Sequence, residues 1–211
     1  METITRTVHL AVYDTLADWE AGLVIAQLNT GGNQTGPTRY TVATVGESTD
    51  PIRTMGGMRV LPDLALDDLS PADSAMLILP GASTWDSGGN TAFARTARAF
   101  LDAGVPVAAI CGATAGLARE GLFDDREHTS AAPEYLAATG YRGGELYREA
   151  AAVRDRGLIT AGPTTPVDFA RAIITELDTW QPAVLDAWYR LFAFSDASAY
   201  GELMALTAGQ Q

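Results

Sequence analysis

Short apolar runs alternate with longer amphipathic stretches along the chain, and this alternation predicts an α/β fold. The runs at 8–13, 75–79 and 105–110 are almost continuously apolar, as strands buried on both faces of a parallel sheet are. Segments with helical spacing separate them. We therefore expect a three-layer α/β/α sandwich with a mainly parallel, flavodoxin-like sheet.

The remaining elements follow from the same patterns and from turn residues. Further strands are expected at 39–46 and 128–130, a small hairpin or crossover at 52–61, a hairpin at 150–160, and a short helical turn at 64–69. Helices are expected at 15–29, 91–102, 113–119, 133–139, 166–177, 182–194 and 200–206. We assign residues 1–180 to one domain and 181–211 to a helical extension, which packs on that domain or at a dimer interface.

The first helix contains a carboxylate where an apolar residue is expected. Thr15 is predicted to cap this helix and Gly31-Gly32 to end it. Glu20 falls within the stripe expected to face the sheet, which comprises Leu16, Trp19, Leu23, Ala26 and Gln27. Either Glu20 lies at the edge of this stripe and reaches water, or it is a functional group inside it.

Composition narrows the compartment and the partners. The net charge of −12 argues against nucleic acid and anionic membranes as partners. A single cysteine excludes an intrachain disulfide, which favours a reducing compartment. No apolar stretch has the length of a signal peptide or of a membrane span. We expect a cytoplasmic protein.

That single cysteine, Cys111, follows the buried run 105–110 and precedes Gly112 and a helix. Strand, nucleophile, glycine and helix in this order form a nucleophile elbow. The amino end of the helix favours a thiolate over a thiol, and the thiolate is the stronger nucleophile. The alternative is that Cys111 is a small buried apolar residue, as most free cysteines are.

A second turn follows the run 75–79, with the sequence Pro-Gly-Ala-Ser at 80–83. The backbone N–H groups of Gly81 or Ala82, together with that of Gly112, would suit an oxyanion hole. An ordinary tight turn is the alternative. Trp85 and Asp86 come next and are expected to wall a pocket. In a doubly wound sheet these turns and the first helix converge beyond the carboxyl ends of the strands.

Four segments in a fixed order resemble the DJ-1/PfpI superfamily, also called class I glutamine amidotransferase-like proteins. They are Asp-Trp-Glu at 18–20, Leu-Ile-Leu-Pro-Gly-Ala at 77–82, Ala-Ile-Cys-Gly-Ala-Thr at 109–114 and Leu-Ile-Thr-Ala-Gly-Pro-Thr-Thr at 158–165. The resemblance spans about 7–180. It implies that Glu20 bonds to Cys111 and lowers the pKa of its thiol, that Thr164 borders the pocket, and that the protein is a homodimer.

The histidines depart from the family's patterns. The chain has only His9 and His128, so the Cys-His-acid triad of glutaminases is not supported. PfpI-type proteases carry a histidine directly after the cysteine, where this chain has Gly112. DJ-1-like members place one in a loop that corresponds to Ala131-Ala132. His128 lies a few residues early, and it either reaches the site or is an ordinary strand residue.

The leading hypothesis is a cysteine-dependent enzyme that acts on a small carbonyl or amide through Cys111, tuned by Glu20. Hydrolase, hydratase and glyoxalase-type reactions all occur in the superfamily. The alternative is a non-enzymatic redox sensor or stress protein whose Cys111 is oxidised to a sulfinate. One cysteine and two distant histidines offer no metal site, and we expect no cofactor.

Overall fold

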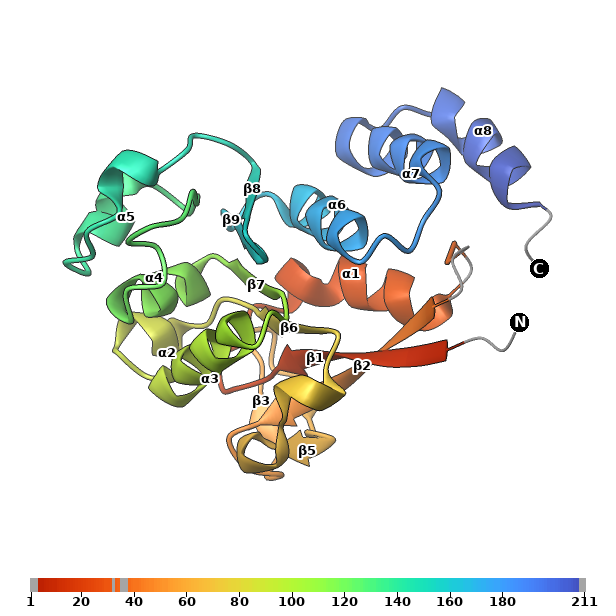
Figure 1. Ribbon diagram of the computed structural model, residues 1–211. Coiled ribbons are helices and arrows are strands. Elements are labelled where there is room, and N and C mark those ends of the chain that lie inside the picture. The colour runs from red at the N-terminus through yellow and green to blue at the C-terminus, as the bar shows by residue number, and fades with distance from the viewer. Residues whose placement is uncertain (1–3, 32, 35–37, 209–211) are drawn as a thin grey trace.

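The computed structural model describes residues 4–31, 33–34 and 38–208, and its centre is a seven-stranded sheet (Figure 1). Across the sheet the strands are β5 (Leu64–Ala65), β2 (Thr38–Gly46), β1 (Ile4–Ala11), β6 (Met76–Leu79), β7 (Val107–Ile110), β9 (Leu158–Ala161) and β8 (Ala152–Asp155). All neighbours are parallel except β8 and β9. The predicted mainly parallel sheet is confirmed.

Helices cover both faces of this sheet. On one face α1 (Asp18–Thr30) packs against α6 (Pro166–Glu176). On the other lie α3 (Thr91–Asp102) and α4 (Gly112–Arg119), with the short α2 (Ser83–Asp86) against α4. The three-layer sandwich is therefore also confirmed. A small α5 (Pro133–Ala137) packs on α4, and 3₁₀ turns occur at Leu66–Asp68, Pro71–Asp73 and Gly144–Leu146.

The connections between β1 and β7 create the place where a site can form. The chain runs from β1 outward to β2 and β5, then returns across the sheet to β6 and β7. Strand order therefore reverses between β1 and β6. The loops after these two strands diverge to opposite faces there, which opens a crevice at the carboxyl ends. The segments leading to α1, α2 and α4 all begin at this edge.

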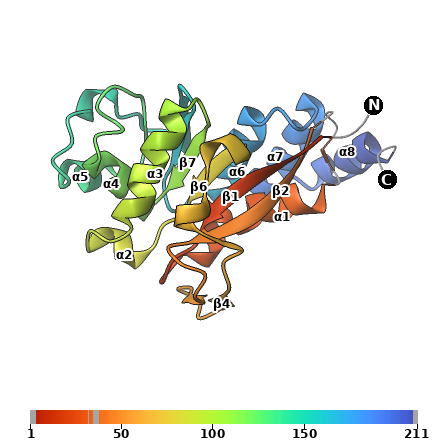
Figure 2. The ribbon, with the colours of Figure 1, turned by 60° about the horizontal axis from the view of Figure 1, so that its bottom comes forward.

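Smaller elements match the predicted pattern with local differences. The hairpin β3 (Ile52–Arg53) and β4 (Arg59–Val60) is antiparallel and projects from the sheet (Figure 2). The predicted helical turn at 64–69 begins instead as β5 and only then turns. The expected strand at 128–130 is reduced to a single β-bridge, between His128 and Tyr147.

The first helix begins later than predicted. Thr15 does not cap it: Thr15 has φ +64° and its N–H donates to the carbonyl of Arg53 at 2.8 Å. The helix runs from Asp18 to Thr30, and Gly31 caps its end with a φ of +65° that suits glycine. Gly32 lies outside the described residues.

The face of α1 that meets the sheet also differs from the prediction. Its buried residues are Glu20, Ala21, Val24 and Leu28. Trp19, placed on the inner face by the sequence pattern, is 51% exposed. The inner face is thus centred on Glu20, so the interpretation of Glu20 as an edge residue is wrong.

Trp85 occupies the core and does not wall the crevice, which corrects the prediction for this residue. Its ring is fully buried and lies over Gly116 of α4, where a Cβ atom would come within 2.2 Å of the ring. Its indole N–H donates to Tyr13 Oη at 3.0 Å. Arg119 donates to the backbone carbonyl of Trp85 at 2.7 Å. Together these contacts dock α2 on α4.

The last two helices, α7 (Pro182–Phe194) and α8 (Ser198–Thr207), follow the predicted pattern. α7 packs on α6, and α8 packs on α7. The Trp188 ring meets the Trp180 ring edge-on with centroids 5.6 Å apart. Arg190 bonds to Glu202 at 2.8 Å and joins the two helices. The division of the chain at residue 180 and a dimer interface in this region stay predictions.

No helix in the described part of the chain combines the length and apolar character needed to cross a membrane.

Two glycines inside helices test the docking of α2. Gly116→Ala places a Cβ against Trp85, and we expect it to lower the free energy of unfolding by about 1–3 kcal/mol. Gly22→Ala, in α1, has open space around the new Cβ, so helix propensity alone should stabilise the protein by about 0.5–1 kcal/mol. Urea unfolding of both variants measures this difference. Equal effects would contradict the tight contact.

Candidate active site

Cys111 lies on a sharp turn between β7 and α4. Its backbone has φ +57° and ψ −126°, a conformation that residues other than glycine rarely adopt. The turn is held by its own N–H, which donates to Ala161 O at 3.1 Å, and by its carbonyl, which accepts from the Thr114 N–H at 3.0 Å. The Thr114 hydroxyl donates to the same carbonyl at 2.5 Å. Strain of this kind, fixed by surrounding bonds, is characteristic of a nucleophile elbow.

Glu20 and Cys111 meet at Gly81. Glu20 is fully buried, and its Oε2 accepts from the Gly81 N–H at 2.5 Å. A Cβ built on Gly81 would lie 2.8 Å from Glu20 Oε2, 2.8 Å from Cys111 Cβ and 3.0 Å from Cys111 Sγ. Only glycine therefore allows all three to come together. The turn after β6 is a close approach of three chain segments.

The carboxyl and the thiol affect one another's titration. Burial raises the pKa of Glu20 to about 7, although the hydrogen bond from the Gly81 N–H lowers this pKa. Burial and the charge of ionised Glu20 raise the pKa of Cys111 to about 12, although the Gly112 N–H lowers it. While Glu20 is ionised, the pKa of the Cys111 thiol is therefore raised, whereas the sequence predicts it to be lowered. The site thus accommodates one negative charge and resists a second.

The position of the proton decides the chemistry. Glu20 Oε1 is buried and has no hydrogen-bond partner among the described residues. When Glu20 holds the proton, its repulsion of the sulfur disappears and its O–H has a thiolate beside it to bond to. The singly charged pair therefore includes a form with a neutral carboxylic acid and a nucleophilic thiolate.

The predicted oxyanion donors differ in availability. The Gly81 N–H is occupied by Glu20. Within the described residues the Ala82 N–H has no acceptor, and Gly112, as the first residue of α4, has no partner in its helix. The Ala82 nitrogen lies 3.5 Å from the position of a Cβ on Gly112. Ala82 and Gly112 are therefore the pair suited to receive an oxyanion.

A cavity of about 200 Å³ opens over Cys111. Among the residues that border it, three large side chains were not predicted from the sequence: Trp19, Met55 and Tyr135. Asp86, which was expected near a pocket, borders the cavity as well. The described residues around it are Ala17, Trp19, Glu20, Met55, Gly81, Ala82, Ser83, Asp86, Cys111, Gly112, Ala131 and Tyr135.

The β3–β4 hairpin brings Met55 to the cavity. The Met55 N–H donates to Leu16 O at 2.8 Å, and the neighbouring Gly56 N–H donates to Asp18 Oδ2 at 2.6 Å. The start of α1 thus holds the hairpin tip, which leaves the Met55 side chain 49% exposed. The sequence pattern predicted the element at 52–61 but not the contact of its tip with the start of α1.

Neither histidine borders this cavity, which corrects the suggestion that His128 reaches the site. The His128 ring is fully buried and stacks on Phe123 with centroids 4.6 Å apart. Its Nδ1 bonds to Arg126 O at 2.8 Å and its Nε2 to Tyr141 Oη at 3.0 Å. Both nitrogens are used, so His128 is a structural residue. His9 bonds to Ser74 through Nδ1 on β1.

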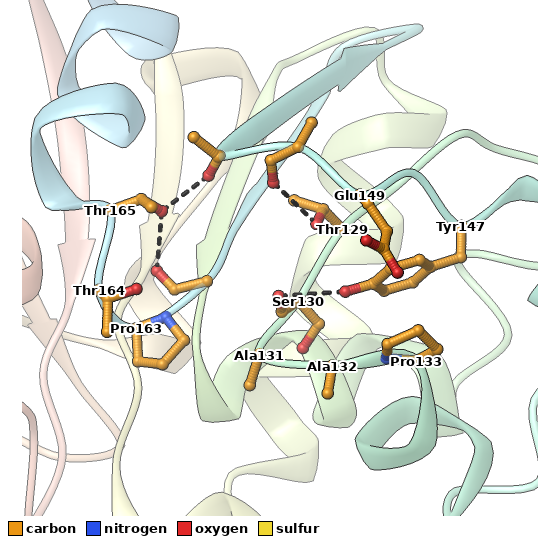
Figure 3. A pocket seen from close by; sticks show the side chains of 13 residues that line it. Thr129, Ser130, Ala131, Ala132, Pro133, Tyr147, Glu149, Pro163, Thr164 and Thr165 are labelled. Carbon is orange, nitrogen blue, oxygen red and sulfur yellow. Dashed lines mark hydrogen bonds between the residues drawn. The ribbon is translucent and has the colours of Figure 1, made fainter.

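Thr164 borders a different hollow, which lies beyond Ala131 (Figure 3). This second hollow is larger, about 680 Å³, and Tyr147 and Glu149 stand on its other side. Ala131 belongs to the rims of both. The Trp19 indole donates to Pro163 O at 3.2 Å and so closes the border between them. Thr164 does not line the cavity of Cys111, so the prediction that it does is wrong.

Comparison with known proteins identifies the chain's relatives. The model of the DJ-1/PfpI family matches residues 6–176. The chain belongs to the DJ-1/PfpI family. The elbow cysteine and its buried glutamate are thus found in a member of the family that the sequence motifs indicated.

Other comparisons cover nearly the whole DJ-1/PfpI chain. Uncharacterized protease YoaZ from Bacillus subtilis is 36% identical over 95% of this chain and 97% of its own length. A thiJ/pfpI family protein from Bacillus anthracis has a crystal structure that superposes with a TM-score of 0.90, at 35% identity over 97% of this chain and 98% of its own. A DJ-1 superfamily protein from Agrobacterium tumefaciens gives 0.80, at 31% identity over 90% and 98%.

The first prediction for this site concerns the reactivity of Cys111 towards iodoacetamide. Because the pair releases its first proton near pH 7 and the second only far above, the alkylation rate should rise to a plateau with a midpoint near 7. In Glu20→Gln the amide is a weaker donor to the thiolate and burial is unchanged, so the midpoint should rise. Mass spectrometry of the single cysteine gives the rates.

A different profile would contradict this proton position. If the wild-type rate climbs without a plateau beyond pH 10, the proton leaves Glu20 alone and Cys111 stays a thiol. Glu20→Gln would then increase the rate, because it removes the opposing charge.

The second prediction concerns stability. The folded pKa of Glu20, about 7, exceeds its ordinary value of 4.5. Between these values the folded protein holds a proton that the unfolded chain has released, so raising the pH destabilises the fold. The free energy of unfolding of Glu20→Gln relative to wild type should therefore increase by about 2–3 kcal/mol from pH 5 to pH 8.

Urea unfolding at the two pH values measures this change. Glu47→Gln is the matched control, since Glu47 is exposed and the same substitution there should give no such pH dependence. A constant difference between wild type and Glu20→Gln would show that Glu20 is ionised throughout.

Proposed function

We propose that this DJ-1/PfpI protein is a cysteine-dependent enzyme, a hydrolase, hydratase or glyoxalase-type lyase, that acts on a small carbonyl or amide. The observation that carries the proposal is the strained Cys111 turn beside fully buried Glu20, at the base of a cavity. A structural cysteine needs neither a positive φ nor a buried carboxyl group beside it.

The first step is addition of the Cys111 thiolate to the electrophilic carbon. The N–H groups of Ala82 and Gly112 receive the negative oxygen, since that of Gly81 is engaged. Glu20 then transfers its proton to the oxygen or to a leaving nitrogen, and its carboxylate becomes a base for an incoming water. In this scheme Glu20 takes the place of the histidine that other cysteine hydrolases use.

The size of the cavity favours small substrates. About 200 Å³ admits a few carbon atoms and their polar substituents. Two relatives from Bacillus subtilis carry the name Uncharacterized protease, which supports hydrolysis of an amide. The absence of a histidine from the described cavity rim argues against a glutaminase triad.

The second candidate is redox sensing. Cys111 is partly exposed, and the Gly112 N–H beside its sulfur would stabilise a sulfinate. The chain has no second cysteine to resolve a sulfenic acid as an intrachain disulfide. A sensor and an enzyme need the same tuned cysteine, so turnover must distinguish them.

We expect the purified protein to turn over a member of a panel of small 2-oxoaldehydes, amides and isocyanides. Cys111→Ser should lower kcat/KM by about 10³-fold or more, because a hydroxyl without a strong base is a poor nucleophile. Glu20→Gln should lower it by about 10²-fold. Glu47→Gln should leave it unchanged.

The products decide among the versions. Lactate from methylglyoxal supports the glyoxalase type, and its absence rejects that type. A different result would favour redox sensing over catalysis. In that case no compound in the panel is converted more than once per chain, while peroxide adds two oxygen atoms to Cys111.

A further inference from the structure

The rim of the Cys111 cavity carries carboxylates and no cation. Glu20 lies at its base and Asp86 at its mouth, and none of the described residues around it is lysine, arginine or histidine. Arg119 acts on the rim residue Tyr135, whose pKa its charge lowers, but its side chain donates to the Trp85 carbonyl and borders a separate small cavity. A substrate carboxylate would find no ion partner in the cavity.

Asp86 is held at the mouth by contacts on two sides. The Tyr135 hydroxyl of α5 donates to Asp86 Oδ1 at 2.6 Å. Asp86 is also the last residue of α2, which the buried Trp85 ring fixes over Gly116. Asp86 is exposed, and these two contacts hold its carboxylate beside the cavity. Its charge also acts on Cys111, whose pKa it helps to raise.

We propose that Asp86, positioned by Tyr135, makes the Cys111 cavity select uncharged or cationic electrophiles and reject carboxylates. The inference rests on the proposed function and narrows its substrate class. Small 2-oxo acids and free amino acids with a terminal carboxylate would be excluded. Neutral aldehydes, ketones and amides, with the apolar side of the molecule against Trp19 and Met55, would be accepted.

Two alkylating reagents of equal shape test this selection without any assumed substrate. Iodoacetamide is neutral and transfers a carbamidomethyl group to the sulfur, whereas iodoacetate is anionic and transfers a carboxymethyl group. Both reactions release iodide. The rate ratio of the two is measured for Cys111 and for N-acetylcysteine amide, a neutral thiol that corrects for intrinsic reactivity. Mass spectrometry at the lone cysteine gives both rates, at one pH and at physiological ionic strength.

We expect Cys111 to disfavour iodoacetate more than the reference thiol does, by about 10-fold, the effect of a fixed charge at short range near a protein surface. Asp86→Asn keeps an oxygen that accepts from Tyr135 and removes the charge. The preference of Cys111 for iodoacetamide over iodoacetate should therefore fall by about 5-fold. Asp67→Asn is the matched control. Asp67 is exposed and does not border the cavity, so the ratio should not change.

Each outcome has one meaning. A Cys111 ratio equal to that of the reference thiol overturns the selection and leaves the proposed function standing. A strong preference that survives in Asp86→Asn, or falls equally in Asp67→Asn, overturns the role of Asp86. If neither reagent reacts with Cys111 at any pH, the nucleophile itself is absent and the proposed function fails with the inference.

Discussion

The hydrogen bond from the Gly81 N–H to Glu20 holds the site together. It joins the loop after β6 to the first turns of α1, and the space left by the missing side chain of Gly81 is filled by Cys111 from the loop after β7. Three connections that leave the sheet at its carboxyl edge are thereby fixed within a few ångströms. A methyl group at position 81 would separate them, since there is no room for it beside the sulfur and the carboxylate.

This contact also sets the charge of the site. A buried carboxyl group that accepts one backbone N–H is still short of partners for its second oxygen, so its charged form is disfavoured. The thiol is the nearest group that can respond. The fold therefore creates a pair that shares one proton, and it does so without the histidine that usually performs this task. His128 has the right residue type, but both of its ring nitrogens are hydrogen-bonded, to Arg126 and Tyr141, and its ring stacks on Phe123.

The walls of the cavity come from parts of the chain that are distant from the elbow in sequence. The β3–β4 hairpin contributes Met55 because Asp18 and Leu16 hold its tip, and α5 contributes Tyr135. The docking of Trp85 over Gly116 orients α2 and with it Asp86. Backbone contacts far from the sulfur thus decide which side chains a substrate would meet.

The sequence by itself determined the layers, the parallel sheet and the elbow at Cys111, and it marked Glu20 as a carboxylate among apolar helical positions whose role the pattern left open. The layers, the sheet and the elbow follow from local signals, namely apolar runs of strand length and the order of strand, cysteine, glycine and helix, which depend on neighbours in the chain. Tertiary structure decided the rest. Whether Trp85 faces a pocket or the core depends on a glycine 31 positions later, and whether His128 meets Cys111 depends on Tyr141 and Arg126. Such side-chain directions arise from contacts between distant segments, and no local pattern encodes them.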